Sequence, residues 1–199
     1  MIILLAAIAY VLGAIPFGYL LVRSTTGRDV RAEGSGNIGA TNVLRTTGRA
    51  AGIATLLLDI GKGYLAVWIA GRLSDQGVMA MCAATLGVMA GHAFPVFLRF
   101  KGGKAVASFV GAFLCLTPIA LGAVLVVFVV VVAWTRYISM GSVVSAATFP
   151  LAVWLMQKDL TMLATAAIAG AFIIYKHSSN IARVHDGKEN VFTFGARKS

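Results

Sequence analysis

The chain alternates between long apolar runs and short polar segments. Residues 1–22 and residues 105–135 contain no Lys, Arg, Asp or Glu at all. A membrane-spanning helix needs roughly 20 mostly apolar residues, so this pattern predicts an all-α membrane protein. The apolar runs are 1–22, 52–71, 78–97, 105–135, 137–156 and 160–176.

The run at residues 105–135 is too long for one ordinary span. At about 1.5 Å per residue it would reach ~46 Å as a single helix, whereas the hydrocarbon core is only ~30 Å thick. Pro118 lies near its middle and would break or kink a helix there, because proline lacks the backbone N–H. The run is therefore one long kinked span or two short ones, which gives six or seven spans in all.

The distribution of cations distinguishes these two topologies, because Lys and Arg collect in cytoplasmic loops. With seven spans, fourteen of the 17 Lys and Arg residues fall on one side; only Arg72 and Lys158 fall on the other, and Lys62 lies within a span. With six spans the division is nine against seven. We therefore expect seven transmembrane helices, with the N-terminus outside and the C-terminus in the cytoplasm. The weakness of this topology is that residues 105–117 are short for a full span.

Composition supports a single polytopic membrane domain over residues 1–199. The chain is 59% apolar and 12% charged, with a mean hydropathy of +0.87, so no separate soluble domain is expected. Loops 23–51 and 98–104 and the tail 177–199 would then share the cytoplasmic face. The net charge of +10 suits anionic lipid and anionic substrates at that face, rather than nucleic acid.

The first polar loop carries the sequence GSGNIGATN at residues 34–42, followed by Arg45. Its spacing matches GxGxxG, but no buried strand precedes it, which argues against a dinucleotide-binding fold. Glycines still let backbone N–H groups converge on an anion, and a helix N-terminus adds partial positive charge. Ser35, Thr41 and Asn42 add neutral donors, while Arg45 can grip a phosphate with two hydrogen bonds. We interpret the segment as an anion-binding loop; the alternative is a flexible polar loop.

The second motif is GHAFPVFLRFKGGK at residues 91–104. Lys101 and Lys104 flank a glycine pair just before an apolar helix, which is the composition of a phosphate cradle. The spacing of a Walker A loop is absent, and interfacial lysines that snorkel toward water are the alternative. His92 lies near the end of a span, where a structural, hydrogen-bonded histidine is favoured over a catalytic one.

The third motif is KHSSNIARVHDGKE at residues 176–189. If a helix continues beyond the last span, His177, Asn180 and Arg183 are spaced by three and share one face. Histidine is the natural proton-transfer residue near neutral pH. The alternative is a tail that binds lipid headgroups.

Other charged and polar residues limit the chemistry. Asp59 and Lys62 lie three apart within a span and can pair on one helix face; intramembrane charges often mark function, but a structural pair is favoured here. No carboxylate cluster suits a metal and no His/Cys cluster suits zinc, so neither a metal nor another cofactor is expected. No His is followed five positions later by Asp, which excludes the HxxxxD acyltransferase signature.

With these motifs, the sequence resembles the PlsY-type glycerol-3-phosphate acyltransferases, bacterial membrane enzymes that use acyl phosphate as donor. The resemblance covers essentially the whole chain and is carried by residues 34–42, 91–107 and 176–189. It implies seven spans in the bacterial inner membrane and an active site that faces the cytoplasm. It also implies the first acylation step of phospholipid synthesis, in which the sn-1 hydroxyl of glycerol 3-phosphate receives the acyl group and lysophosphatidic acid and phosphate are formed. An acyl-phosphate-producing enzyme and membrane lipid would be the partners.

The resemblance also suggests roles for individual residues. Ser35, Arg45, Lys104 and His177 would be catalytic. Ser35 could be a nucleophile or a hydrogen-bond donor, and the donor role is favoured because no base adjoins it in sequence. The general base would be His177 or the substrate's own phosphate. The expected substrate-binding residues are Gly36, Asn37, Thr41, Asn42, Lys101, Gly102, Gly103, Asn180, Arg183 and Glu189. A transporter of organic phosphates and a non-catalytic lipid-headgroup binder are the competing interpretations; transporters tend to carry internal repeats, which we do not find.

Overall fold

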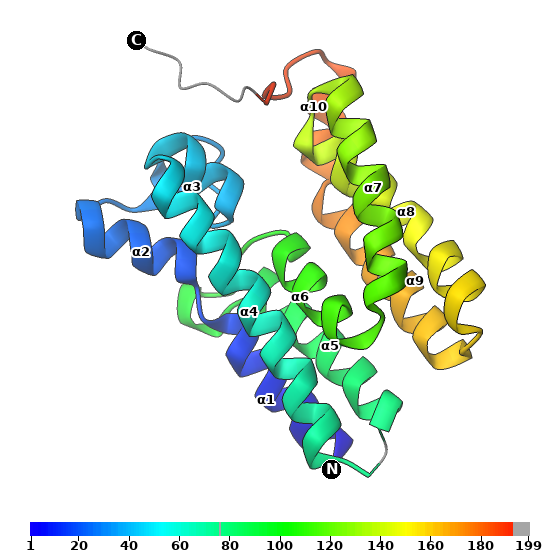
Figure 1. Cartoon of the computed structure of the whole chain (residues 1–199). Coiled ribbons are helices and arrows are strands. Elements are labelled where there is room, and N and C mark those ends of the chain that lie inside the picture. The colour runs from blue at the N-terminus through cyan, green and yellow to red at the C-terminus, as the bar shows by residue number, and fades with distance from the viewer. Residues whose placement is uncertain (76, 193–199) are drawn as a thin grey trace. The chain divides into compact units, whose positions relative to one another are not determined.

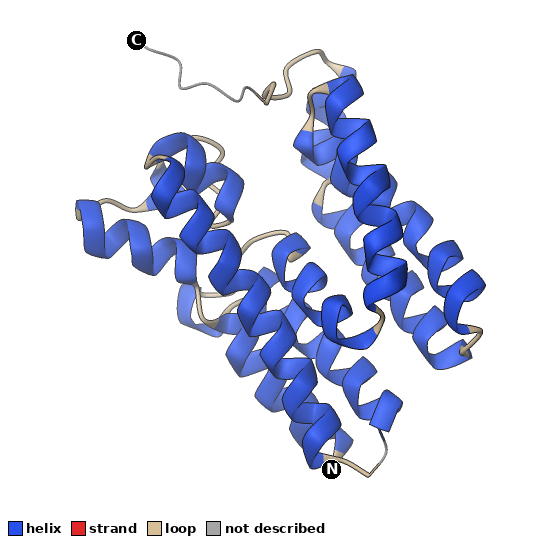
Figure 2. Cartoon of the chain, viewed as in Figure 1, coloured by secondary structure: helices blue, strands red, loops and turns tan. Residues whose placement is uncertain are grey.

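The computed structural model describes residues 1–75 and 77–192, which form helices, turns and loops with no strand in those ranges (Figures 1 and 2). The prediction of an all-α membrane protein is confirmed. The chain divides into two compact units, Met1–Leu116 and Thr117–Ser199, and each is described by itself below. Arg197 and Lys198, which contributed to the cation count, lie outside the described residues.

The first unit is held together by close helix packing. Helix α1 packs against α5, and α4 packs against both α5 and α6. A Cβ atom at Gly13 of α1 or at Gly91 of α5 would overlap the backbone of the facing helix, so these small residues let the two helices approach closely. The elements of this unit are α1 Ile2–Ala14, α2 Phe17–Thr26, η1 Val30–Ala32, α3 Ala40–Thr46, α4 Arg49–Leu73, α5 Gly77–Ala93, η2 Val96–Leu98 and α6 Val106–Leu116.

The predicted first span is broken in the structure. Helix α1 ends before Ile15, whose backbone is extended, and α2 begins after Pro16. The sequence interpretation overlooked this break, which follows from the steric restriction that a proline places on the residue before it. The carbonyl of Ile15 accepts a hydrogen bond of 2.8 Å from Lys62 Nζ on α4. Residues Ile2–Thr26 nonetheless qualify together as one apolar candidate span.

The second unit is a row of helices that ends in a bend. Helix α8 packs against both α7 and α9, and α9 and α10 meet at an angle of 53°. The tail therefore continues as helix after the last span, but it changes direction. The elements of this unit are α7 Pro118–Thr135, α8 Ile138–Gln157, α9 Leu160–Lys176 and α10 Ser178–His185.

Pro118 divides the long apolar run, as the sequence predicted. Helix α6 ends at Leu116, and Pro118 opens α7 in the first turn, where a helix has no use for the missing N–H. By length and composition, five helices of the described chain can cross a membrane, or six if the bent pair α9 and α10 is one span. Helix α6 has only 11 residues. The chain is that of an integral membrane protein, while seven spans and the orientation of the termini remain predictions.

Candidate active site

The first glycine-rich loop folds around Asn42, a buried residue in the first turn of α3. Asn42 Oδ1 accepts the Ser35 N–H at 2.9 Å. Its Nδ2 group donates at 2.8–3.2 Å to three backbone carbonyls, those of Val30, Glu33 and Asn37. A side-chain amide has only two N–H donors, so these contacts occupy it fully. We predicted Asn42 as a substrate ligand, and in this structure its side chain holds the shape of the loop.

This loop leaves Ser35, Gly36 and Thr41, together with the following Arg45, on the surface. Gly34 and Gly36 adopt φ values of +58° and +70°, a left-handed conformation that glycine accepts at little cost. Ser35 between them is exposed, and so are Thr41 and Arg45 on α3. The hydroxyl groups and the guanidinium are thus accessible to a ligand from water.

A separate ion pair fixes the start of the loop. Asp29 precedes η1 and accepts the backbone N–H of Arg31 at 2.9 Å, and the two side chains form an ion pair of 2.7 Å. Arg31 also lies over the Tyr19 ring, 5.1 Å from its centroid. The hydrogen bond from Arg31 holds the pKa of Asp29 below its ordinary value. Because Asp29 stays ionised and neutralises Arg31, Arg45 is the more available cation of this loop.

The second motif brings a glycine pair against His92, which lies in the last turn of α5. The Gly103 N–H donates to the His92 carbonyl at 3.0 Å. A Cβ atom at Gly103 would overlap His92 Nε2, and one at Gly102 would overlap the His92 carbonyl and the Pro95 ring. Only glycine lets the backbone pass this close to the histidine. The glycine pair Gly102–Gly103, which we predicted as a phosphate cradle, therefore packs directly against His92.

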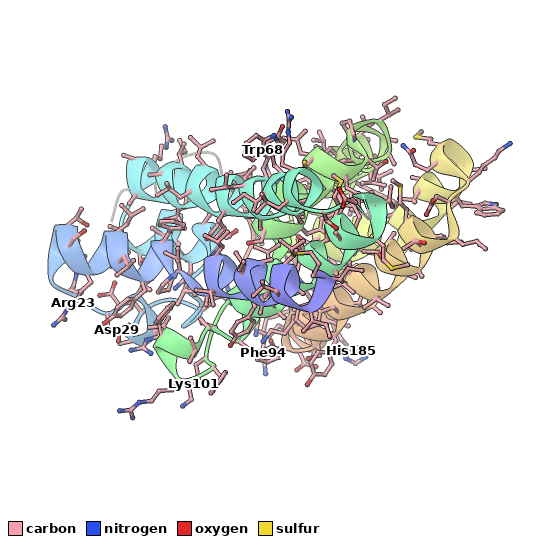
Figure 3. The ribbon with its side chains drawn as sticks, turned by 90° about the horizontal axis from the view of Figure 1, so that it is seen from below. Arg23, Asp29, Trp68, Phe94, Lys101 and His185 are labelled. Carbon is pink, nitrogen blue, oxygen red and sulfur yellow. The ribbon has the colours of Figure 1, made fainter. Side chains whose placement is uncertain are left out.

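The glycine pair follows an unusual backbone path. Arg99, Phe100 and Ala105 all have positive φ values, of 52°, 61° and 61°, and such conformations persist only where the surrounding structure enforces them. Lys101 is exposed and points away from the helices (Figure 3), whereas Lys104 is half-buried. The two lysines therefore bracket the glycines on a segment whose course is tightly fixed.

A buried ionic cluster lies behind this segment. Lys62 Nζ is 2.8 Å from Asp59 Oδ1, and the His92 Nδ1 atom is 3.6 Å from the same oxygen. All three side chains are at most 4% exposed. The predicted pairing of Asp59 with Lys62 is confirmed. Sequence spacing did not indicate that His92 joins them, because His92 lies on another helix, 33 residues after Asp59.

The third motif closes around Glu189, whose side chain is only 6% exposed. The carboxylate accepts hydrogen bonds of 2.7–2.8 Å from three side chains: Ser139, Asn180 and Arg183. Burial by itself would raise the pKa of Glu189, but these hydrogen bonds outweigh it and lower the pKa below its ordinary value. Asn180 and Arg183 share a helix face as predicted, and they meet Glu189. Ser139 was missed, because it lies 50 residues away in sequence.

His177 occupies the bend between α9 and α10. The His177 ring Nδ1 lies 2.8 Å from the Ile173 carbonyl, and the His177 backbone N–H donates to the carbonyls of Ile173 and Ile174. An Nδ1–H bond to a carbonyl selects the tautomer whose lone pair is on Nε2. The buried imidazole is therefore held in a form that can accept a proton at Nε2.

These arrangements define a class of protein: a polytopic helical membrane protein with basic, glycine-containing loops. In the described ranges, no group of three or more His, Cys, Asp or Glu side chains could hold a metal ion. The family model for glycerol-3-phosphate acyltransferase matches residues 3–187. The chain therefore belongs to the glycerol-3-phosphate acyltransferase family, which confirms the predicted resemblance.

Relatives and solved structures agree with this family. The glycerol-3-phosphate acyltransferase of Geobacter sulfurreducens is 45% identical over 192 residues, covering 96% of this chain and 97% of the relative. That of Trichlorobacter lovleyi is 47% identical over 184 residues, covering 92% and 94%. The crystal structure of PlsY, an integral membrane glycerol 3-phosphate acyltransferase, matches in its glycerol 3-phosphate form with a TM-score of 0.90 at 34% identity over 96% of both chains. Its lysophosphatidic acid form matches with a TM-score of 0.87 at 32% identity, covering 96% of this chain and 95% of that one.

Proposed function

We propose that this protein transfers a fatty acyl group from acyl phosphate to the sn-1 hydroxyl of glycerol 3-phosphate, giving lysophosphatidic acid and phosphate. The observation that carries the proposal is the pair of basic, glycine-containing loops in the first unit, because both substrates are phosphates and the donor's acyl chain belongs in lipid. The names of the relatives, together with the glycerol 3-phosphate and lysophosphatidic acid forms of PlsY, support the acceptor and the product. Acyl phosphate as donor rests on the resemblance and on the two loops.

In the first unit, we assign the cations and backbone amides to the phosphate groups. Arg45 is exposed and suited to two-point phosphate binding. Lys104 adds a compact positive charge beside the glycine pair. Ser35 would donate a hydrogen bond rather than act as a nucleophile. Charges placed before the reaction begins stabilise the negative charge that develops on the carbonyl oxygen during attack. Other contacts would come from Gly36, Asn37, Thr41, Lys101 and Gly102. Asn42 and Gly103 donate to carbonyls of the protein, so they would hold the two loops in shape.

In the second unit, His177 and Asn180 would orient glycerol 3-phosphate, while Glu189, paired with Arg183, holds Asn180 in place. In the proposed step, the sn-1 oxygen attacks the acyl carbon, and a new C–O bond forms as the acyl C–O bond to phosphate breaks. Phosphate leaves with the bonding electron pair. The hydroxyl proton passes either to His177 Nε2, whose lone pair the Ile173 contact favours, or to a phosphate oxygen of a substrate.

We further propose that residues 1–199 form one polytopic domain of seven spans in the bacterial inner membrane. The N-terminus would lie outside, and loops 23–51 and 98–104 and the tail 177–199 would face the cytoplasm. The asymmetric distribution of Lys and Arg supports this orientation. Acyl phosphate would come from a partner enzyme that makes it. A reporter fused after Ser199 should report the cytoplasm, and an external signal would overturn the seven-span topology.

The direct test uses the purified protein in lipid cubic phase or detergent, with glycerol 3-phosphate and either palmitoyl phosphate or palmitoyl-CoA. We expect phosphate and lysophosphatidic acid from palmitoyl phosphate alone. Product from palmitoyl-CoA alone would refute the donor assignment. Uptake of glycerol 3-phosphate into protein-containing vesicles, without product, would instead establish a transporter.

The role of Ser35 has its own test. If acyl transfer is direct, intact-protein mass spectrometry during turnover should show no acyl adduct, and Ser35→Ala should keep measurable activity. An adduct that maps to Ser35 would establish a covalent intermediate in its place.

A further inference from the structure

The cluster of Asp59, Lys62 and His92 connects distant parts of the first unit. On one side, Lys62 Nζ donates to the Ile15 carbonyl at 2.8 Å, at the break between α1 and α2. On the other side, the His92 ring stands directly behind Gly103. A continuous line of buried contacts therefore runs from the broken first span, through α4 and the end of α5, to the glycine pair of the second motif.

His92 has a distinctive environment within this line. Its Nδ1 atom is buried and makes no hydrogen bond among the described residues, although it faces Asp59 Oδ1 at 3.6 Å. That separation is too long for a hydrogen bond, so the Nδ1 edge of the ring faces the carboxylate without bonding to it. The ring is thus held between a carboxylate on one edge and a backbone that it touches on the other.

Stability alone does not account for such a cluster. Buried ions lose their hydration, and apolar residues of similar volume often stabilise a fold equally well or better. The tight fit between His92 and Gly103 provides another reason for its presence, because the imidazole packs against the segment that leads to Lys104. The flanking positive φ values of Phe100 and Ala105 mean that this path needs external support.

We propose that His92, oriented by Asp59, is a positioning residue that fixes the Gly102–Gly103 segment and thereby the placement of Lys104 toward a substrate phosphate. Lys62 anchors the carboxylate and ties the arrangement to the α1–α2 break. This inference rests on the proposed function, because it identifies the residue that supports one of the proposed phosphate-binding segments. His92 would touch no reacting atom.

Two substitutions of His92 test the roles of the two edges of its imidazole ring separately. In His92→Asn, the amide can take the place of Nδ1 beside Asp59, but nothing fills the space behind Gly103. In His92→Gln, the amide reaches the place of Nε2 and preserves that support. We expect His92→Asn to raise the KM for a phosphate substrate about tenfold with a much smaller change in kcat, and His92→Gln to raise it less than threefold, since small displacements of positioning groups have large kinetic effects.

The matched control is Thr85→Val on the same helix. Thr85 is fully buried, and in the described part of the chain its hydroxyl donates within α5, to the Met81 carbonyl at 2.9 Å. It should leave both KM values unchanged. A purely structural role for His92 predicts that His92→Asn lowers the unfolding temperature while the protein that remains folded keeps its KM, and this result would overturn the proposal.

A double-mutant cycle adds a second criterion. Gly103→Ala pushes a methyl group into the His92 ring, so it should disturb the same segment. If His92 acts through Gly103, the effects of His92→Asn and Gly103→Ala on KM should be strongly non-additive. Additive effects would contradict the proposal. Asp59→Asn together with Lys62→Met removes both charges and should reproduce the KM increase; an unchanged KM in that folded variant would also contradict it.

The acyltransferase activity and the positioning role of His92 can be refuted separately. If the wild-type protein does not form lysophosphatidic acid from palmitoyl phosphate, the proposed function fails, and glycerol 3-phosphate binding measured by calorimetry still tests the role of His92. If the wild type is active and the His92 variants bind glycerol 3-phosphate and palmitoyl phosphate like the wild type, the positioning role alone fails.

Discussion

The two units organise their polar motifs around opposite kinds of centre. In the first unit, the loop at residues 34–42 folds around the neutral amide of Asn42 and leaves Ser35 and Arg45 exposed. In the second unit, the C-terminal motif folds around the carboxylate of Glu189, which takes donors from three side chains. The neutral Asn42 bonds to backbone groups and so leaves the nearby cation Arg45 available to a ligand. The anionic Glu189 instead binds the nearby cation Arg183 itself.

The two motifs should therefore interact differently with an approaching anion. An anion that approaches the first loop meets the accessible guanidinium of Arg45 and hydroxyl of Ser35, as the proposed function requires. An anion that approaches the second motif meets Arg183 already paired at 2.8 Å. We therefore expect substitutions of the exposed residues Ser35 and Arg45 to act mainly on rate, and substitutions at the buried centres Asn42 and Glu189 to act mainly on stability.

The largest effect should come from Arg45→Ala. Loss of one preorganised charged donor typically lowers kcat by roughly 10²–10³-fold, and Arg45 is exposed, so the fold should survive. Steady-state acyl transfer and the thermal unfolding midpoint in detergent would be measured together. Arg72→Ala is the matched control, because Arg72 is predicted to lie on the opposite membrane face and contacts only the Trp68 ring among the interactions resolved. An equal loss in both variants would contradict the role of Arg45.

Glu189→Gln should destabilise the second unit strongly. The amide NH₂ cannot accept the hydrogen bonds that the carboxylate accepts, and each hydrogen bond to a charged group contributes about 1.5–3 kcal/mol. We expect a loss of about 2–3 kcal/mol, measured by thermal unfolding in detergent. Glu33→Gln is the control, since Glu33 pairs with Arg28 at the surface and exposed ion pairs contribute ~1 kcal/mol or less. A stable Glu189→Gln protein with low activity would shift Glu189 from a structural to a catalytic role.

Asn42→Asp tests the neutral centre with almost no change in shape. Aspartate can still accept the Ser35 N–H, but it turns the three donor contacts with backbone carbonyls into repulsive ones. We expect a loss of about 1–3 kcal/mol, as for a buried group deprived of its partners. Asn37→Asp is the comparison, because Asn37 accepts the Gly39 N–H through Oδ1, which aspartate preserves. Equal unfolding temperatures for the two variants would show that Asn42 is not the centre of the loop.

The smallest expected effect is on the pH dependence of stability. The pKa of Glu189 is lowered in the folded protein, so the unfolded chain takes up a proton first as the pH falls. The stabilisation is complete above the ordinary value of 4.5 and is lost as the pH falls through the lowered folded-state value. Unfolding midpoints at acid pH should therefore drop more steeply for the wild type than for Glu189→Gln. Parallel curves would mean that Glu189 is not specially stabilised as an anion.

Much of the site was predictable wherever the relevant geometry is local. The i, i+3 spacing of Asp59 and Lys62 gave their pairing, because a helix places such residues side by side. Pro118 predicted where the long apolar run divides, because a proline interrupts a helix at its own position. Pro16 was equally local, and its break was missed because the surrounding apolar residues suggested an unbroken span.

Apolar length and short-range spacing are properties of the chain alone, so the sequence was sufficient to predict an all-α membrane protein, its three polar motifs and its family. Only the tertiary structure placed His92 behind Gly103 and beside Asp59, and brought Ser139 to Glu189. These contacts join residues on different helices, and helix packing decides which faces meet. Packing also determined that Asn42 supports its loop, because only burial shows that its amide is already bonded to the protein.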